Sequence, residues 1–356
     1  MPTQFPYIQS LIDDPEVMRI LIDGWQHVYV EKNDRFEDVS NIFQNEDELY
    51  ALIQDMAKEL KKPADKMNPI TWLRASDGMR VDMILPPVSL VGPAVSILKV
   101  NPHQIMLDDL LHSGALTQPA ADFLKACVQG RVNIAISGCT ASGKSTLLKI
   151  MARWIPLDER ILFLQQFGEA GLPHSRLITL ETCPPNAEGQ GEVSMLDLVL
   201  SALRMRPDRI LVEEIQGEET GELVNAMNRG HDGSLFTLNS NSLRDTLTRL
   251  ERLVGMNDPE LPLRAVREQV SGAVDLVVHL ERLRDGSRKI VNITEVSGME
   301  NGIITLTDIF LYEIRGFQGG AIVGSLRATG LIPKFLDNLV SHGSQLPMNL
   351  FTPVAV

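Results

Sequence analysis

Cysteines are scarce in this chain, long apolar runs are missing and basic residues are outnumbered by acidic ones. Its 356 residues include three cysteines, Cys127, Cys139 and Cys183, whose spacing forms neither a disulfide framework nor a zinc site. No apolar run approaches the length of about 18 residues that a membrane-spanning helix needs. The start, MPTQFPYIQSLIDD, lacks a basic segment followed by an apolar one, so we expect no signal peptide. These absences predict a protein of the reducing cytoplasm.

The excess of acidic residues, 46 against 33 basic ones, gives a formal net charge of −13. So acidic a chain has little attraction for the phosphate backbone of nucleic acid, and we expect no nucleic-acid partner. Hydrophobic residues make up 44% of the chain, which is enough for sizeable cores. The length favours two domains.

A complete phosphate-binding loop pattern is present in NIAISGCTASGKSTLLKIMARW, residues 133–154. An apolar run predicts a buried strand ending at Gly138, and Gly143, Lys144 and Ser145 follow after four residues. The two glycines let successive backbone N–H groups turn toward phosphate oxygens. Lys144 is then placed for the β- and γ-phosphates, and the Ser145 hydroxyl for Mg²⁺. Apolar residues at helical spacing after the loop predict a helix whose positive end faces the phosphates.

The loop therefore predicts binding of ATP with Mg²⁺. The predicted binding residues are Gly138, Cys139, Thr140, Ala141, Ser142, Gly143, Lys144, Ser145 and Thr146, of which Ser145 is also a metal ligand. We interpret Cys139 as a small tolerated side chain within the loop and not as a redox group.

The second half of this site is expected at the end of another strand, in RPDRILVEEIQGEE. Residues 210–212 form a short apolar strand, and Glu213 and Glu214 follow at its exposed end. A carboxylate there orients magnesium-bound water or polarises an attacking water, so Glu214 is a predicted catalytic residue and metal ligand. The alternative is a solvated acidic loop, because EEIQGEE contains four glutamates in seven residues.

The order of predicted elements divides the chain into four parts. Residues 1–100, with the helical pattern EDELYALIQDMAKEL and several short strands, predict a small α/β domain. Residues 101–118 are polar and rich in proline and glycine, and they predict a linker. In residues 119–315, the strand-like runs NIAIS, RILFL, RLITL, RILVE, GSLFTL and DLVVHL alternate with helical ones, which predicts a doubly wound, mainly parallel sheet. Residues 316–356 form a C-terminal tail.

Two long segments carry a resemblance to a known family. LETCPPNAEGQGEVSMLDLVLSALRMRPDRILVEE and MNRGHDGSLFTLNSNSLRDTLTRLERLV resemble the secretion and pilus-assembly ATPases, the type II/IV secretion protein E-like superfamily. The nearest branch is the CpaF type of the tight-adherence (Flp/Tad) pilus, and the resemblance extends to both ends of the chain.

This resemblance implies a RecA-like P-loop NTPase domain preceded by the small α/β domain, with ATP bound between them. It also implies a hexameric ring of identical or paralogous ATPase subunits. The ring would lie on the cytoplasmic face of the inner membrane, against a polytopic platform protein, and closure of the ATP cleft would drive pilin insertion or export.

The chain departs from the family pattern at groups that move protons or neutralise charge. Gln165 and Gln166 replace a glutamate and an aspartate of the acidic box, Asn239 replaces the histidine of the histidine box, and Leu98, Cys183 and Gln216 replace arginines. The family arginines Arg80, Arg204 and Arg206 are kept, and the resemblance assigns them to nucleotide binding. Gln165 is the predicted catalytic residue at the acidic-box position.

Three functions fit these observations to different degrees. Loss of a general base slows a reaction by about 10²–10⁴-fold, and loss of a charge-stabilising arginine by about 10³–10⁵-fold. The replacements therefore favour an ATP-binding, hydrolysis-poor subunit that serves beside an active paralogue. A fully active motor ATPase is the alternative function, because glutamine can orient an attacking water without accepting its proton. A small-molecule kinase fits less well, since no arginine-rich lid segment is visible.

Overall fold

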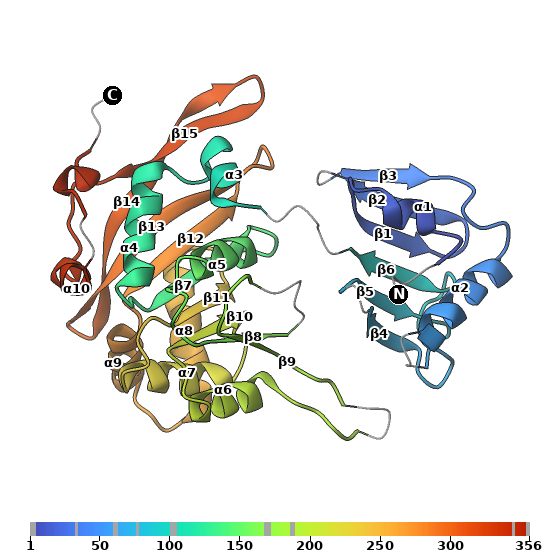
Figure 1. The fold of residues 1–356 in the computed structure, drawn as a ribbon, viewed down its shortest axis with the longest axis horizontal. Coiled ribbons are helices and arrows are strands. Elements are labelled where there is room, and N and C mark those ends of the chain that lie inside the picture. Colours follow the sequence, from blue (N-terminus) through green and yellow to red (C-terminus); the bar gives the residue numbers. More distant parts are fainter. Residues whose placement is uncertain are drawn as a thin grey trace. The chain divides into compact units, whose positions relative to one another are not determined.

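The computed structural model describes residues 5–32, 35–59, 63–75, 78–99, 105–166, 172–185, 189–343 and 346–353 (Figure 1). The chain divides into two compact units, Met1–Gln104 and Ile105–Val356. Among the described residues, no helix is both long enough and apolar enough to cross a membrane.

The first unit is a six-stranded sheet with one long helix. Its strands are β1 (Val17–Asp23), β2 (His27–Lys32), β3 (Arg35–Val39), β4 (Ile70–Arg74), β5 (Arg80–Ile84) and β6 (Ala94–Leu98), and its helices are α1 (Gln9–Asp13) and α2 (Glu46–Glu59). The order is β3-β2-β1-β6-β5-β4, and the strand pairs among the described residues are antiparallel. Alternate strand residues such as Ile20, Val81 and Ile97 are buried against Leu52 and Met56 of α2, which gives this unit its own core.

The second unit is built on a nine-stranded sheet in the order β15-β14-β13-β12-β7-β11-β10-β8-β9. Strands β7 (Ile134–Gly138), β8 (Ile161–Gln165), β9 (Leu177–Glu181), β10 (Arg209–Glu213), β11 (Leu235–Asn239) and β12 (Leu276–Arg282) are parallel to one another. Strands β13 (Arg288–Glu300), β14 (Ile303–Gln318) and β15 (Ala321–Ala328) continue the sheet with antiparallel pairing. The six predicted strands of this region correspond to β7–β12.

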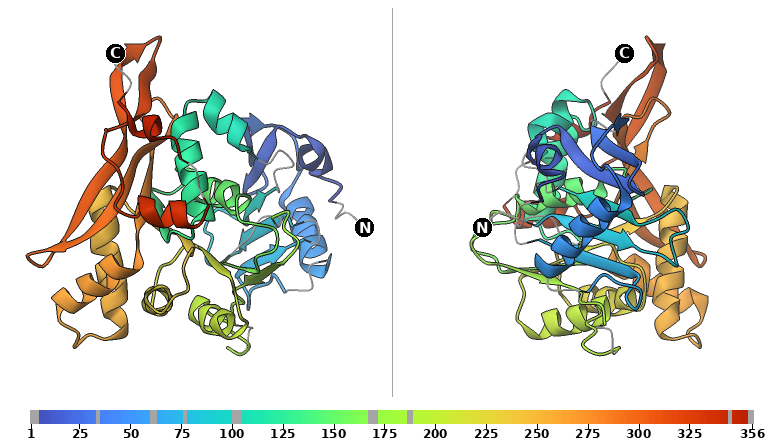
Figure 2. Two further views of the ribbon diagram at one scale, coloured as in Figure 1. Left: turned by 60° about the vertical axis from the view of Figure 1, so that its left-hand side comes forward. Right: turned by 90° about the vertical axis from the view of Figure 1, so that its right-hand side faces the viewer.

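Helices cover both faces of this sheet, as Figures 1 and 2 show. On one face lie α4 (Gln118–Gln129) and α5 (Lys144–Ala152), and on the other lie α6 (Met195–Arg204), α7 (Glu219–Asn228), α8 (Leu243–Asn257) and α9 (Leu263–Ala273). Strand β7 is buried along its whole length, with Ile134 and Ile136 facing one cluster and Ala135 the other. This two-sided burial explains why the strand reads as a continuous apolar run.

The predicted boundaries at residues 118/119 and 315/316 fall inside the second unit. Residues 101–104 of the predicted linker lie outside the described residues, and helix α3 (Leu107–His112) follows them. At the other end, the sheet runs on through β15, and α10 (Leu336–Ser341) and the 3₁₀ helix η1 (Met348–Phe351) come after it.

The C-terminal segment is held to α4 by aromatic contacts. The ring centroid of Phe123 on α4 lies 5.7 Å from that of Phe310, 6.3 Å from that of Phe335 and 5.7 Å from that of Phe351. Phe123 and Phe310 are fully buried and Phe351 nearly so. The tail therefore completes the same hydrophobic core that β7 and α5 build.

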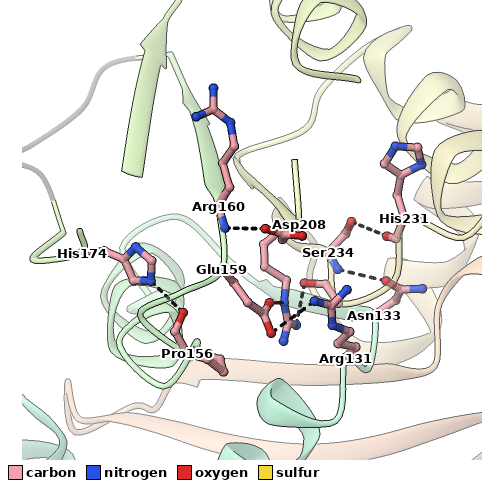
Figure 3. Close-up of polar contacts among 11 residues, drawn as sticks. Arg131, Asn133, Pro156, Glu159, Arg160, His174, Asp208, His231 and Ser234 are labelled. Atoms are coloured by element: carbon pink, nitrogen blue, oxygen red, sulfur yellow. Dashed lines mark hydrogen bonds and ion pairs between the residues drawn. The ribbon is translucent and has the colours of Figure 1, made fainter. Parts of the chain in front are cut away.

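A buried ion pair ties together the amino-terminal ends of the parallel strands. The Arg209 side chain, at the start of β10, has no exposed surface, and its Nε donates to Glu159 Oε2 at 2.5 Å. Glu159 Oε1 also lies 3.3 Å from Arg131 Nη2, and Figure 3 shows this cluster. Arg209 Nη1 donates to the carbonyl oxygen of Gly233. A Cβ atom at Gly233 would lie 2.0 Å from that nitrogen, so only glycine leaves room for the guanidinium.

We expect Glu159→Gln to destabilise the second unit by about 3 kcal/mol, because it leaves a buried guanidinium without a counter-charge. The matched control is Glu268→Gln, which removes the exposed Arg264–Glu268 pair on α9 and should change stability by less than about 0.5 kcal/mol. Urea unfolding of the wild type and both variants measures the difference. Equal, small changes in the two variants would contradict a structural role for the buried pair.

Candidate nucleotide-binding site

The parallel strands bring the predicted site residues to one edge of the sheet. Gly138, at the end of β7, is in register with Asn239 at the end of β11. At the end of β10, Glu213 is in register with Gln165 on β8, which in turn pairs with Glu181 on β9. Because carboxyl ends of parallel strands meet at the same edge, segments more than 100 residues apart in sequence lie together here.

The phosphate-binding loop has a backbone that depends on its glycines. Gly138 has a φ of +150°, and a Cβ atom there would lie 2.3 Å from the carbonyl oxygen of Leu280 on β12. Gly143 has a φ of +101° and precedes the first residue of α5, so the loop enters the helix through a left-handed turn. Ala141 also has a positive φ, and its carbonyl oxygen accepts a 2.8 Å hydrogen bond from Arg288 Nε.

The other loop residues differ in exposure. Ser142 is buried, Cys139, Ser145 and Thr146 are half-buried, and Thr140 is exposed. Ser145 belongs to the first turn of α5, whose N–H groups have no intrahelical acceptors. Such a turn suits an anionic group.

Lys144 is joined to Glu214 through Asn239. Its Nζ donates to the carbonyl oxygen of Cys139 and to Asn239 Oδ1, each at 2.8 Å. Asn239 Nδ2 in turn donates to Glu214 Oε1, which also accepts a 2.8 Å hydrogen bond from Gln216 Nε2. Burial lowers the pKa of Lys144, and the nearby Glu214 carboxylate opposes that shift. A cation and a carboxylate thus share one side-chain amide at the mouth of the loop.

Glu214 is held in an unusual backbone conformation. Its φ is +65°, a region that residues other than glycine seldom occupy. The Glu214 N–H donates to Thr237 Oγ1 at 2.8 Å, and the next N–H, of Ile215, donates to the carbonyl oxygen of Thr237 at 2.9 Å. Two bonds to β11 therefore fix the turn that aims this half-buried carboxylate at Asn239.

The donor set fits a magnesium ion that is held together with phosphates. Ser145 offers a hydroxyl and Glu214 a carboxylate, the hard oxygen ligands that Mg²⁺ prefers. Within the described ranges, no group of three or more His, Cys, Asp or Glu residues could hold a metal. Magnesium is commonly bound by one or two protein oxygens plus phosphates and water, so the set is suitable without a protein cage.

Gln165 occupies a buried position with an unsatisfied acceptor. Its side chain lies at the end of β8 and is 2% exposed, and its Oε1 accepts no hydrogen bond from the described part of the chain. Gln166 is exposed, and residues 167–171 of the predicted acidic-box segment lie outside the described residues. The chain thus presents a buried amide oxygen at the position for which the resemblance predicts a carboxylate.

The three predicted arginines lie on different elements. Arg80 is on β5 of the first unit, where its Nη2 donates to Asp82 Oδ1 at 2.7 Å. Arg204 ends α6 and Arg206 lies in the turn before β10, both exposed. They lie beyond the amino-terminal end of β10, whereas the phosphate loop follows the carboxyl-terminal end of β7. Five strand residues span about 16 Å, so neither arginine reaches the loop of its own chain.

Two contacting residues, Thr237 and His279, have no motif that marks them in the sequence. Thr237 lies inside β11, and its role depends on the register of β11 with β10. His279 lies on β12, is 1% exposed, and its Nδ1 is 2.8 Å from Ser137 Oγ on β7. Burial lowers the pKa of His279 to about 4, with Asp245 opposing the shift and Lys144 adding to it. Both residues are visible only once the strands are paired.

A family model described as "Type II/IV secretion system protein" matches residues 3–309, which include the loop, Gln165, Glu214 and Asn239. The chain belongs to this family. The predicted superfamily is therefore confirmed, and the CpaF-type branch stays a prediction.

Members of the type II/IV secretion family from several bacteria are similar to this chain. The conjugal transfer protein TrbB of Rhizobium radiobacter is 32% identical over 254 residues, which cover 70% of this chain and 75% of TrbB. The type IV secretion system protein VirB11 of Brucella abortus is 28% identical over 318 residues, 81% of this chain and 87% of VirB11.

A solved structure shares the fold of this chain. The X-ray structure of the Legionella pneumophila ATPase DotB superposes with a TM-score of 0.58 at 16% identity, covering 85% of this chain and 83% of DotB. The predicted fold class, an α/β RecA-like domain with a mainly parallel sheet preceded by a smaller α/β domain, is confirmed.

In this secretion-family chain, His279 makes stability depend on pH. Its folded pKa of about 4 lies below the usual 6.5, so its contribution is complete above about pH 6.5 and is lost as the pH falls toward 4. Relative to His279→Gln, the wild type should lose about 2 kcal/mol of unfolding free energy between about pH 7 and pH 5. Urea unfolding of both proteins at each pH measures this difference.

The comparison with His279→Gln also cancels the effect of a group whose titration changes stability in the opposite direction. Burial raises the pKa of Asp275 to about 6, so its effect favours folding as the pH falls. That effect is the same in both proteins and cancels in the difference. A pH-independent difference between them would show that His279 titrates normally in the folded chain.

Proposed function

We propose that this chain is an ATP-binding subunit of a type II/IV secretion or Flp/Tad pilus-assembly machine, with weak or absent ATP hydrolysis. It would serve a structural or regulatory role beside an active paralogue. The observation that carries the proposal is the contrast within one site: the phosphate loop is intact, while Gln216 and Asn239 place amides at Glu214 and Gln165 places another at the buried end of β8.

ATP would be held by the backbone of residues 138–146 and by the Lys144 ammonium. Ser145 and Glu214 would hold Mg²⁺, which neutralises phosphate charge when it is bound. The loop enters α5 through Gly143, so the unpaired N–H groups of the first helical turn add to the attraction for phosphate. These residues supply binding without any residue that must accept a proton.

Proton transfer is the step for which this chain has few groups. A side-chain amide does not accept a proton near neutral pH, so Gln165 cannot act as the general base that a carboxylate at its position would be. Asn239 and Gln216 both donate to Glu214 Oε1, which occupies an oxygen that a general base needs. Loss of a base slows hydrolysis by about 10²–10⁴-fold.

A second function, that of an active motor powering secretion or pilus assembly, is favoured by one observation. The Gln165 Oε1 is buried and accepts no hydrogen bond from the described residues, so it is available to accept one from an attacking water. Glutamine orients the attacking water in this way in some GTPases. The two functions differ in turnover, not in nucleotide binding.

We propose that the subunit works in a hexameric ring with identical or paralogous subunits. The ring would lie on the cytoplasmic face of the inner membrane and contact a polytopic platform protein. Arg80, from the first unit, would contact the nucleotide bound between the two domains. Since Arg204 and Arg206 are exposed and far from their own loop, they would contact the nucleotide of a neighbouring subunit.

The nucleotide-binding proposal predicts that Lys144→Ala weakens Mg·ATP and Mg·ADP binding by about 10–100-fold, because a charge-assisted hydrogen bond to phosphate is lost. Lys125→Ala, which removes an exposed lysine on α4, is the matched control and should bind as the wild type does. Titration with a fluorescent nucleotide analogue provides the affinities. Equal affinity of wild type and Lys144→Ala, or no binding by either, would count against the proposal.

The hydrolysis proposal predicts wild-type turnover at or below about a hundredth of a typical motor rate of order one per second. The triple variant Gln165→Glu, Asn239→His and Cys183→Arg should raise turnover measurably, and Gln165→Glu alone should raise it less, because such groups act as a unit. A carboxylate at position 165 would be buried and in register with Glu213 and Glu181. Burial and nearby carboxylates raise a carboxyl pKa, which suits a general base.

Phosphate release at saturating ATP measures these rates. Gln318→Glu is the control, since it adds the same charge at an exposed position at the end of β14, outside every predicted site motif. Wild-type turnover near about one per second, with a steep drop in Gln165→Ala, would instead show the active motor.

A further inference from the structure

Lys144 already has two hydrogen-bond acceptors from the protein at its ammonium group. It is 7% exposed, and its Nζ donates 2.8 Å hydrogen bonds to the carbonyl oxygen of Cys139 and to Asn239 Oδ1. An ammonium group has three N–H donors, so two of the three are engaged within the chain. A phosphate group that takes more than one hydrogen bond from Lys144 must compete with at least one of these acceptors.

The side-chain amide of Asn239 is fixed in the orientation in which its oxygen competes with phosphate for the Lys144 ammonium group. Its Oδ1 accepts from Lys144 while its Nδ2 donates to Glu214 Oε1. Rotating the amide by half a turn would set its NH₂ group against the ammonium and its oxygen against the carboxylate, two repulsive contacts. Its backbone is fixed as well, because Asn239 pairs with Gly138 and the next N–H, of Ser240, donates to the Gly138 carbonyl oxygen at 3.1 Å.

The two acceptors of Lys144 are not equivalent. The Cys139 carbonyl belongs to the loop itself, and the loop is where phosphate would lie. Asn239 comes from a neighbouring strand and draws Lys144 toward Glu214, a negative group. Of the two bonds, the one to Asn239 therefore opposes phosphate binding.

We propose that Asn239 determines the affinity of the loop for phosphate groups, by holding Lys144 in a bond that phosphate must break. This rests on the proposed nucleotide binding and deepens it: Asn239 lowers the affinity of the site. A residue that only maintained the shape of the site would have the opposite effect when replaced. The proposal therefore predicts an improvement in binding on loss of a polar side chain.

The test is the affinity of the full chain for Mg·ADP and for inorganic diphosphate, measured by isothermal titration calorimetry. Asn239→Ala and Asn239→Leu both remove the amide, and Leu also keeps the branched shape of the side chain. Each should bind both ligands about tenfold more tightly than the wild type, the worth of one hydrogen bond to a charged group. Asn241→Ala, two residues away and exposed, should bind as the wild type does.

Circular dichroism and unfolding curves show whether each variant is folded. If Asn239→Ala does not fold, the affinity of Asn239→Leu decides the test. Unchanged or weaker binding by folded Asn239 variants, with normal binding by the wild type, overturns this inference and leaves the proposed function standing. Absence of binding by the wild type to either ligand overturns both. Tightening for Mg·ADP but not for diphosphate also overturns it, because the competing bond acts on phosphate and not on the nucleoside.

Discussion

The parallel pairing of β7 with β11 and β12 is the constraint on which the site depends. It sets Gly138 beside Asn239 on one side and beside Leu280 on the other. The Leu280 carbonyl then comes so close that no side chain fits at Gly138, and the chain must turn into the loop there. The same pairing delivers Asn239 to Lys144, and the neighbouring pairing of β11 with β10 places Thr237 where it can fix the turn at Glu214. A shift of register by one residue would move each of these groups to the wrong face of the sheet.

Much of this arrangement could be predicted from local sequence. The phosphate loop, the strand before Glu214 and the alternation of strands and helices all depend on residues close in the chain, and β7–β12 follow that pattern. The bridge from Lys144 through Asn239 to Glu214 could not be predicted, because it joins three segments through strand register. The contact of His279 with Ser137 could not be predicted for the same reason, since nothing in the segment DLVVHL indicates that Ser137 is its partner. The packing of the C-terminal tail on α4 could not be predicted either, because Phe335 and Phe351 find their partner Phe123 some 200 residues earlier in the sequence.

Amides replace ionisable groups at this site in a way that keeps its hydrogen bonding while changing its chemistry. Asn239 and Gln216 donate hydrogen bonds to Glu214. Gln165 occupies a buried position in register with Glu213 and Glu181, where a third carboxylate would be unfavourable in its charged form. On the proposed function, a site of this kind would suit long occupancy by a ligand better than rapid turnover. On the further inference, Asn239 would at the same time compete with phosphate for Lys144, so that occupancy would depend on the balance of two opposing effects.

Phe123 also bears on how the second unit forms during synthesis. Its ring is surrounded by Phe310, Phe335 and Phe351, residues that leave the ribosome long after α4 does. Until they arrive, the apolar face of α4 has no cover, and the core around β7 stays open on that side. Contacts between residues this distant in sequence form slowly, and exposed apolar surface promotes aggregation in the meantime. The nascent chain therefore exposes Phe123 until residues 310–351 have been translated, which leaves a window for aggregation before the core is closed.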